Sequence, residues 1–137
     1  MEVTFINVGY GDAILVQSDD YTILLDGGSA MAGEFEHYPK RIRSADYLKQ
    51  AGLTKIDLLI LSHIHEDHVC GLEAVLDQCQ VGEIRLPYDP SLLSSVHLLA
   101  PNSSAPSSVH LFAAAFNATI RIIESAKRQA IPVGLLQ

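Results

Sequence analysis

The sequence is poor in cysteine and lacks any long uninterrupted run of apolar residues. Its two cysteines, Cys70 and Cys79, fall on one expected helix at a spacing that suits neither a disulfide within that helix nor a zinc ribbon. Nowhere do 18 apolar residues run together, and residues 1–5 have neither the basic nor the apolar region of a signal peptide. We therefore expect reduced, structural cysteines in a soluble, unexported, cytoplasmic protein without a membrane partner.

Basic residues are also scarce. Nine lysines and arginines stand against 16 aspartates and glutamates, giving a net charge of −7. This balance argues against non-specific nucleic-acid binding, because polyanions bind through lysine and arginine. A local basic patch at residues 40–43 leaves nucleic acid open as a partner. With 48% hydrophobic and 18% charged residues, the 137-residue chain suits a single globular domain over residues 1–137.

The hydrophobic pattern predicts an α/β (α+β) chain. Strands are expected over residues 3–8, 13–17 and 22–25 as an antiparallel meander, followed by a helix over about 42–52. Residues 57–62 form a continuously apolar strand, of the kind covered on both faces of a sheet. A helix bearing Leu72, Val75, Leu76 and Cys79 then leads to a strand over 83–86, so the order is strand, helix, strand.

The pattern is weaker after residue 87. Val109 to Ile123 form a helical apolar stripe begun by Pro106, and residues 131–133 suit a strand. The segment 94–98 recurs unchanged at 107–111, but a single copy is too little for a repeat architecture.

The segment His63-Ile64-His65-Glu66-Asp67-His68 follows the apolar strand directly. His63 and His65 are two residues apart, so in an extended chain both imidazoles point to the same side and can bind one ion. Asp67 and His68 lie where the chain turns into a helix and can serve a second ion about 3.5–4 Å away. His68 is expected to point toward the sheet and Glu66 outward. Taken alone, each could be structural, for example Asp67 as a helix cap, but the cluster favours a metal site.

This segment resembles the HxHxDH signature of the metallo-β-lactamase superfamily. Asp26, within Leu24-Leu25-Asp26-Gly27-Gly28, resembles the aspartate that the superfamily keeps beside its site, and residues 8–13 resemble the VGQGDA stretch of its competence-protein (ComEC-like) branch. The resemblance implies an αββα sandwich, of which this chain is the incomplete first half. It also implies that His63 and His65 bind one zinc, that Asp67 and His68 bind a second, and that a bridging hydroxide attacks the substrate.

In this scheme Asp67 is catalytic, while Asp26 and Asp12 support the ligands, although both aspartates also suit turns. Turn glycines with positive φ are expected at Gly9, Gly11, Gly27 and Gly28. The later Gly-Asp and His-His-Gly-Ser segments of the branch do not occur after His68. HxHxDH alone gives two ligands per metal where a catalytic zinc holds three. His97 is a candidate additional ligand, whereas His110 is expected to face solvent.

Two classes of function follow. The first is a metal-dependent hydrolase of a small-molecule phosphodiester or similar ester, with zinc as cofactor and manganese or iron as alternatives. The second is a catalytically incomplete protein that acts as a binding or assembly module. Because much of the second sheet of the sandwich is missing, we expect an apolar sheet face that is covered either in a homo-oligomer or by the 109–123 helix.

Overall fold

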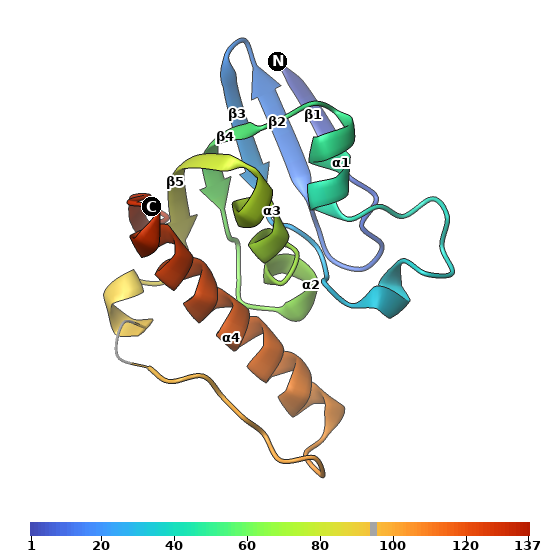
Figure 1. Ribbon diagram of the computed structural model, residues 1–137, viewed down its shortest axis with the longest axis vertical. Coiled ribbons are helices and arrows are strands. Elements are labelled where there is room, and N and C mark those ends of the chain that lie inside the picture. Colours follow the sequence, from blue (N-terminus) through green and yellow to red (C-terminus); the bar gives the residue numbers. More distant parts are fainter. Residues whose placement is uncertain (94–95) are drawn as a thin grey trace.

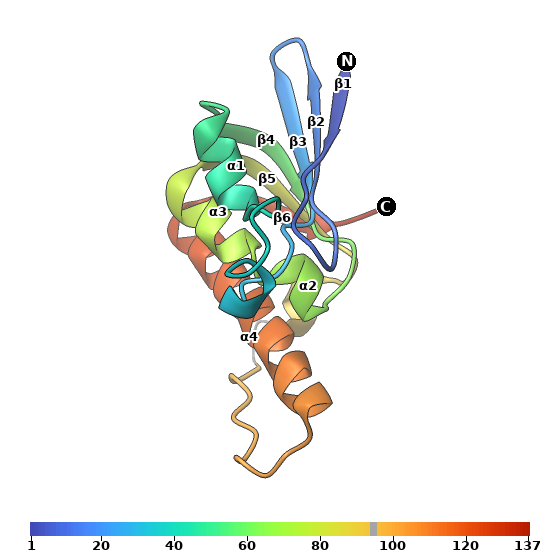
Figure 2. The same cartoon turned by 90° about the vertical axis from the view of Figure 1, so that its right-hand side faces the viewer.

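A computed structural model describes residues 1–93 and 96–137 and shows one mixed sheet with its helices packed on one face (Figures 1 and 2). The six strands lie in sequence order across the sheet. Their bounds are β1 Glu2–Phe5, β2 Ile14–Ser18, β3 Tyr21–Leu25, β4 Lys55–Ile60, β5 Gln80–Leu86 and β6 Val133–Leu135. The α/β prediction is confirmed.

The type of strand pairing changes once across the sheet, at β3. β1, β2 and β3 pair antiparallel, which confirms the predicted meander, whereas β3, β4, β5 and β6 pair parallel. Parallel neighbours need crossover connections, and helices supply them. These are α1 (Ser44–Gln50), α2 (Glu66–Val69) with α3 (Leu72–Gln78), and α4 (Ser107–Arg128). Two short 3-10 helices, η1 (Ala32–Glu34) and η2 (Pro90–Leu93), lie in the loops.

The core lies between the sheet and the helices. Leu15, Leu24, Leu59 and Ile84 are register neighbours across four strands, and each is at most 1% exposed. Buried residues of the helices, including Leu48, Leu72, Val75 and Ile122, belong to the same cluster. The predicted inward faces of the helices over 42–52 and 72–79 are thus confirmed. Cys70 and Cys79 are buried and free, as predicted.

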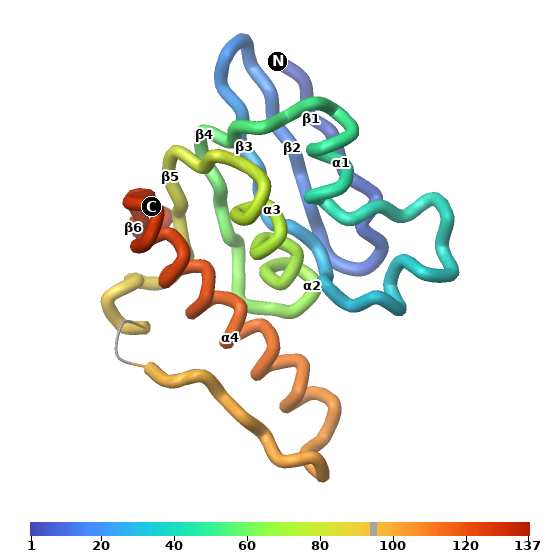
Figure 3. Tube along the Cα trace, in the orientation of Figure 1, coloured from blue at the N-terminus to red at the C-terminus, as the bar shows by residue number. Residues whose placement is uncertain are grey.

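Helix α4 crosses the helical layer and extends beyond it (Figures 1 and 3). It contacts α2 and α3, and its buried side includes Ala115, Ala118 and Ile122. Small residues on this side allow close packing against the shorter helices. Residues 107–112, the first turns, are all exposed. The predicted helix is confirmed, but the alternative that it folds over the opposite sheet face is wrong, because α4 packs on the same side as α1 and α3 (Figure 2).

Within residues 1–93 and 96–137, no helix covers the second face of the sheet (Figure 2). Side chains alternate along a strand, so Leu58 and Ile60 point away from Leu59 and the helices. Leu58 neighbours Ile23, and Ile60 neighbours Leu25; all four are only half-buried. The rows continue to β1 through Val16 to Val3 and through Ile14 to Phe5, which are 48% and 74% exposed. We call these eight residues the open sheet face. The expectation that both faces of the 57–62 strand are covered is wrong for this chain.

Part of the segment 94–98, which recurs at 107–111, lies outside the described residues. Among the described residues, no helix combines the length and apolarity needed to cross a bilayer.

Candidate metal centre

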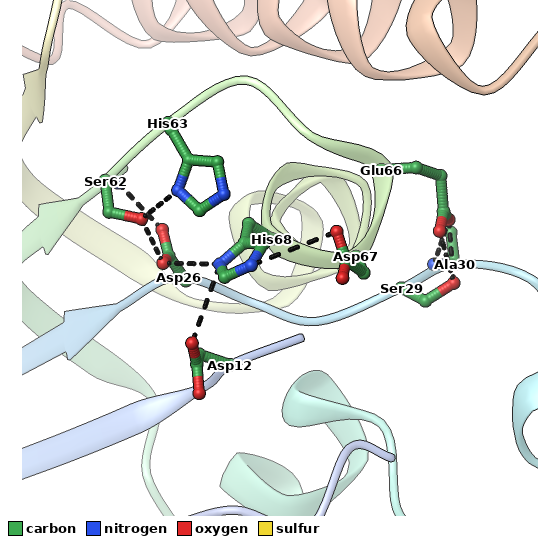
Figure 4. Close-up of polar contacts among 9 residues, drawn as sticks. All are labelled: Asp12, Asp26, Ser29, Ala30, Ser62, His63, Glu66, Asp67 and His68. Atoms are coloured by element: carbon green, nitrogen blue, oxygen red, sulfur yellow. Dashed lines mark hydrogen bonds and ion pairs between the residues drawn. The ribbon is translucent and has the colours of Figure 1, made fainter. Parts of the chain in front are cut away.

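The predicted site lies at the carboxyl ends of two neighbouring parallel strands (Figure 4). Leu25 ends β3 and Ile60, its register neighbour, ends β4. Asp26 follows the first strand directly, and Ser62 and His63 follow the second within three residues. Adjacent parallel strands therefore bring an aspartate and a histidine together from segments more than 30 residues apart in the chain, and α2 adds His68 from the side.

Asp26 is the centre of this hydrogen-bond network. Its side chain accepts hydrogen bonds from the Ser62 amide at 2.8 Å and the Ser62 hydroxyl at 2.5 Å, and it lies 2.9 Å from His68 Nδ1. The residue is 2% exposed, with φ +58°, a left-handed conformation that aspartate tolerates better than most residues. Asp26 thus joins the end of β4 to α2.

The network fixes the orientation of two imidazoles. Because the single Ser62 proton goes to Asp26, the hydroxyl accepts from His63 Nδ1, 2.8 Å away. His68 likewise donates from Nδ1 to Asp26. Both rings then keep the Nε2 lone pair free, and their centroids are 3.9 Å apart. Donor atoms of Asp26, His63 and His68 lie within 4.8 Å of one another.

Electrostatics keep His63 in the form that binds metals. Burial lowers its pKa below the usual value, and the neighbouring His68 and His65 rings lower the pKa further, against weaker opposing effects of Asp26 and Asp67. A neutral imidazole is the form that coordinates a metal ion.

The remaining predicted residues surround this group at different distances. The His65 ring lies 4.6 Å from the His63 ring, and Asp67 Oδ1 lies 3.9 Å from His68 Nε2. Asp12 Oδ2 is 4.0 Å from His68 Nδ1. His97 is not brought into the group: it is exposed in the segment before α4, which Leu99 ties to that helix through two hydrogen bonds with Asn117. His110 is exposed, as predicted.

Glu66 differs from its prediction. It points away from the histidines, but its carboxylate is half-buried rather than free in solvent (Figure 4). The Ser29 hydroxyl lies 2.7 and 2.9 Å from the two carboxylate oxygens and donates its single proton to this group, and the Ala30 amide donates to Oε1 at 3.1 Å. The loop after β3 presents these donors, and Glu66 fixes that loop against α2.

Three backbone segments meet beneath the site. The Gly28 amide donates to Asp12 O at 2.9 Å and the Gly27 amide to His68 O at 2.8 Å. Gly11 has φ +82°, and a Cβ there would lie 1.7 Å from Asp67 O, so only glycine lets the loop approach so closely. The prediction of positive φ is wrong for Gly27. Glycine is needed there because a Cβ would lie only 2.6 Å from Cδ2 of Leu72.

Residues that sequence reasoning missed include Ser62 and Ser29. Ser62 stands immediately before the first histidine, and a hydroxyl next to a metal-binding motif could have been predicted to hydrogen-bond to it. Ser29 acts only through the folded contact with Glu66, and no local pattern marks it.

Comparison with known proteins assigns the family. Residues 6–95 match the family described as the metallo-beta-lactamase superfamily. The chain belongs to this superfamily. The match includes every residue of the candidate centre, from Asp12 to His68, but does not distinguish the competence-protein branch, which stays a prediction. No protein with a curated description matches the chain.

Solved structures of the superfamily share the fold at low identity. A hydrolase of the beta lactamase superfamily, AbOPH, is 22% identical with a TM-score of 0.54, covering 91% of this chain and 43% of its own. AidC, described as a dizinc quorum-quenching lactonase in complex with a product, is 18% identical with a TM-score of 0.54, covering 92% of this chain and 42% of its own. The chain thus spans about two fifths of these structures.

The donor groups of this centre suit a metal ion. The centre combines closely packed imidazoles, one of them held neutral, with the carboxylates of Asp26 and Asp67. Nitrogen and carboxylate oxygen donors of this kind suit zinc, manganese or iron. The residues therefore fit the metal-binding character of the superfamily, while the individual ligand roles stay predictions.

Proposed function

We propose that this chain carries the metal centre of a metal-dependent hydrolase that acts on an ester bond. The observation that carries the proposal is the Asp26–Ser62 network, which directs Nε2 of both His63 and His68 away from their hydrogen-bond partners. Carboxylate and hydroxyl partners that fix the tautomer of a ligating histidine are the usual support of a metal site.

The proposed ligands are His63 and His65 for one ion, and Asp67 and His68 for a second. Zinc is the first metal to test, since AidC is described as a dizinc enzyme, and manganese and iron are alternatives. A bound divalent ion would activate water as the nucleophile and polarise the ester. Asp67, whose side chain is 40% exposed, stands at the open side of the centre, where a substrate can approach.

The protein residues have separate tasks in this proposal. Asp26 and Ser62 hold the two imidazoles, and Glu66 with Ser29 holds the loop that borders the centre. Asp12 lies nearest to Nδ1 of His68, whereas Asp67 lies nearest to Nε2 (Figure 4), and Asp12 reinforces the negative potential around a cation.

Nucleic acid is not the proposed substrate. The arginines of the basic patch are engaged locally: Arg41 pairs with Glu34 at 3.0 Å and lies 3.7 Å from the Tyr38 ring centroid, and Arg43 lies over Phe35. These contacts use the patch to order the loop between β3 and α1. A small-molecule ester or phosphodiester is the class we propose.

A second candidate is an assembly module that lacks a complete active site. The open sheet face favours it, because eight apolar residues in two adjacent rows form a surface of the type that marks interfaces. In this alternative the face pairs with a second copy of the chain, and metal binding is structural. The two candidate functions are distinguished by whether the metal-loaded chain hydrolyses an ester.

The test is hydrolysis of p-nitrophenyl esters and bis(p-nitrophenyl) phosphate by the metal-depleted chain, with and without added zinc, manganese or iron. The proposal predicts turnover that requires metal and is lost in Asp67→Asn, whereas the control Asp46→Asn, an exposed aspartate on α1, keeps it. Zinc uptake without any turnover would favour the assembly module. Turnover that ignores both metal and Asp67 would overturn the metal mechanism.

A further inference from the structure

The turn at residues 9–12, in the loop after β1, lies against the candidate centre, yet its own backbone does little to hold it there. Gly9 and Gly11 have φ of +85° and +82°, a conformation open to glycine, and Gly11 packs against the carbonyl of Asp67. Among the described residues, no hydrogen bond engages the backbone of residues 9–11. The support of this turn therefore comes from a side chain elsewhere in the chain.

Arg41 lies along the turn. A Cβ at Gly9 would meet Cδ, Nε and Cζ of Arg41 at 2.7, 2.8 and 2.9 Å, so the arginine side chain crosses the Gly9 backbone at close range. Its Cζ also lies 5.6 Å from the centroid of the Tyr10 ring. The neighbouring backbone joins the same two segments, since the Ile42 amide donates to the Asn7 carbonyl at 2.9 Å. Arg41 thus contacts both residues that begin the turn.

Arg41 is itself held by the loop between β3 and α1. Its Nη1 donates to the carbonyl of Glu34 at 3.1 Å and to Oε2 of the same residue at 3.0 Å. Its Cζ lies 3.7 Å from the centroid of the Tyr38 ring, and the side chain is only 20% exposed. A guanidinium that is paired and stacked in this way is already engaged within the protein. Its contacts fix the position of its neighbours.

These contacts form a closed ring around α2. Glu66, on α2, accepts a hydrogen bond from Ser29 in the loop after β3. The same loop continues to Glu34, which binds Arg41. Arg41 supports the turn that packs against Asp67, which is again on α2. Arg41 therefore links the two loops that flank the metal-binding segment.

We propose that Arg41 is a positioning residue for the metal centre, which holds the turn at residues 9–12 against α2 and so keeps Asp12 4.0 Å from His68. The inference rests on the proposed function, since α2 carries two of the proposed ligands. The expected effect on metal binding has a distinctive sign. By charge alone Arg41 repels the divalent ions that the centre would hold, so its removal would tighten metal binding. Removal of a support for the ligands weakens metal binding instead.

Amide hydrogen exchange of the metal-depleted chain reports on the turn without any metal. The Gly28 amide donates to the carbonyl of Asp12, whereas the adjacent Gly27 amide donates to the carbonyl of His68. In Arg41→Ala the Gly28 amide should exchange at least about tenfold faster, because the turn is released locally. Exchange of the Gly27 amide should stay unchanged, because its acceptor belongs to α2.

The matched control is Arg43→Ala, which removes the same charge from the same basic patch. Arg43 lies 4.5 Å from the centroid of the Phe35 ring, and its loss should leave Gly28 exchange unchanged. If Arg41→Ala does not fold, Tyr38→Ala replaces it. Tyr38 is 48% exposed, and losing its ring from the guanidinium should raise Gly28 exchange about two- to fivefold.

Zinc affinity, measured by competition with a chelator, is the second readout. Arg41→Ala should bind zinc about three- to tenfold more weakly than the wild type and Arg43→Ala, which is less than the loss expected for a direct partner of a ligand. Tighter zinc binding by Arg41→Ala would show that charge repulsion dominates and would overturn the inference.

The exchange data give the remaining outcomes. Equal Gly28 exchange in Arg41→Ala and the wild type would overturn the inference, as would an equal acceleration in Arg43→Ala. Faster exchange of Gly27 and Gly28 together would mean that Arg41 stabilises the fold as a whole, and would also overturn it. Selective acceleration at Gly28 in a chain that binds no zinc would contradict the proposed function and leave Arg41 as the support of the turn.

Discussion

Asp26 and His68, 42 residues apart in sequence, share a hydrogen bond of 2.9 Å between a carboxylate that is 2% exposed and a histidine that is 9% exposed. The same carboxylate holds Ser62, which in turn holds His63. A single aspartate at the end of β3 therefore orients two imidazoles contributed by β4 and α2. This arrangement explains why the chain places a left-handed, non-glycine residue at that point.

Asp26→Asn should weaken metal binding while the chain stays folded. The amide keeps the size of the carboxylate but loses the charge and one acceptor, so His68 loses its preferred tautomer. We expect a loss of about 10- to 100-fold in zinc affinity, the usual cost of removing a supporting partner. Competition with a coloured chelator measures it. Asp46→Asn is the control, and equal affinities in Asp26→Asn and wild type would contradict the network.

The buried cysteines should be unreactive in the folded protein. Burial raises the pKa of the Cys70 thiol to about 12, and burial also raises the pKa of Cys79. At pH 8 both are neutral, so a disulfide reagent should react fully only after denaturation. Because the folded pKa lies above the unfolded one, the related stability is present below about pH 9 and falls as pH rises toward 12. Rapid reaction of the native protein at pH 8 would contradict this burial.

Core and open-face leucines on the same strand should differ in their contributions to stability. Leu59→Ala removes a side chain that is fully buried between Leu24 and Ile84, and should lower the free energy of unfolding by about 2–5 kcal/mol. Its neighbour Leu58 is half-buried on the open sheet face, so Leu58→Ala should cost clearly less in the monomer. Urea unfolding measures both variants. Equal losses at low protein concentration would show that the open face is covered.

The open sheet face should make this chain self-associate. Val3 and Phe5 are its most exposed members, so Val3→Ser/Phe5→Ser should shift light scattering toward the monomer. The control Tyr88→Ser removes an exposed aromatic in the loop after β5, away from the strands that carry this face. A wild-type monomer at all concentrations that also fails to bind a hydrophobic dye would contradict the expectation.

The sequence predicted the order and type of most elements because their apolar periods are strong. The meander, the helices bearing Leu48 and Val75, and the helix after Pro106 follow from local patterns. The position of α4 was not predictable in this way: an apolar stripe shows that a helix is covered but not which face of a sheet it covers. Likewise, four consecutive apolar residues in β4 indicate burial on both faces, whereas this chain covers only one.

For the site, the motif supplied the candidate residues but not their relationships. His63, His65, Asp67 and His68 could be named from spacing and resemblance, and Asp26 from resemblance alone. That Asp26 contacts both Ser62 and His68, and that Glu66 binds Ser29 and Ala30, depends on contacts between segments distant in sequence. His97 was named as a candidate ligand only because the motif needs further histidines. Its exposed position away from the centre could not be predicted from the sequence.

The most direct test of the account is metal content. The chain, loaded with zinc and dialysed mildly, is compared by elemental analysis with the double variant His63→Ala/His65→Ala and with the control His37→Ala, an exposed loop histidine. Removal of two proposed ligands should abolish retention, because a real site cannot lose both without a large fall in affinity. The account predicts bound zinc in the wild type and in His37→Ala, and little in the double variant. Equal zinc content in all three proteins would contradict it.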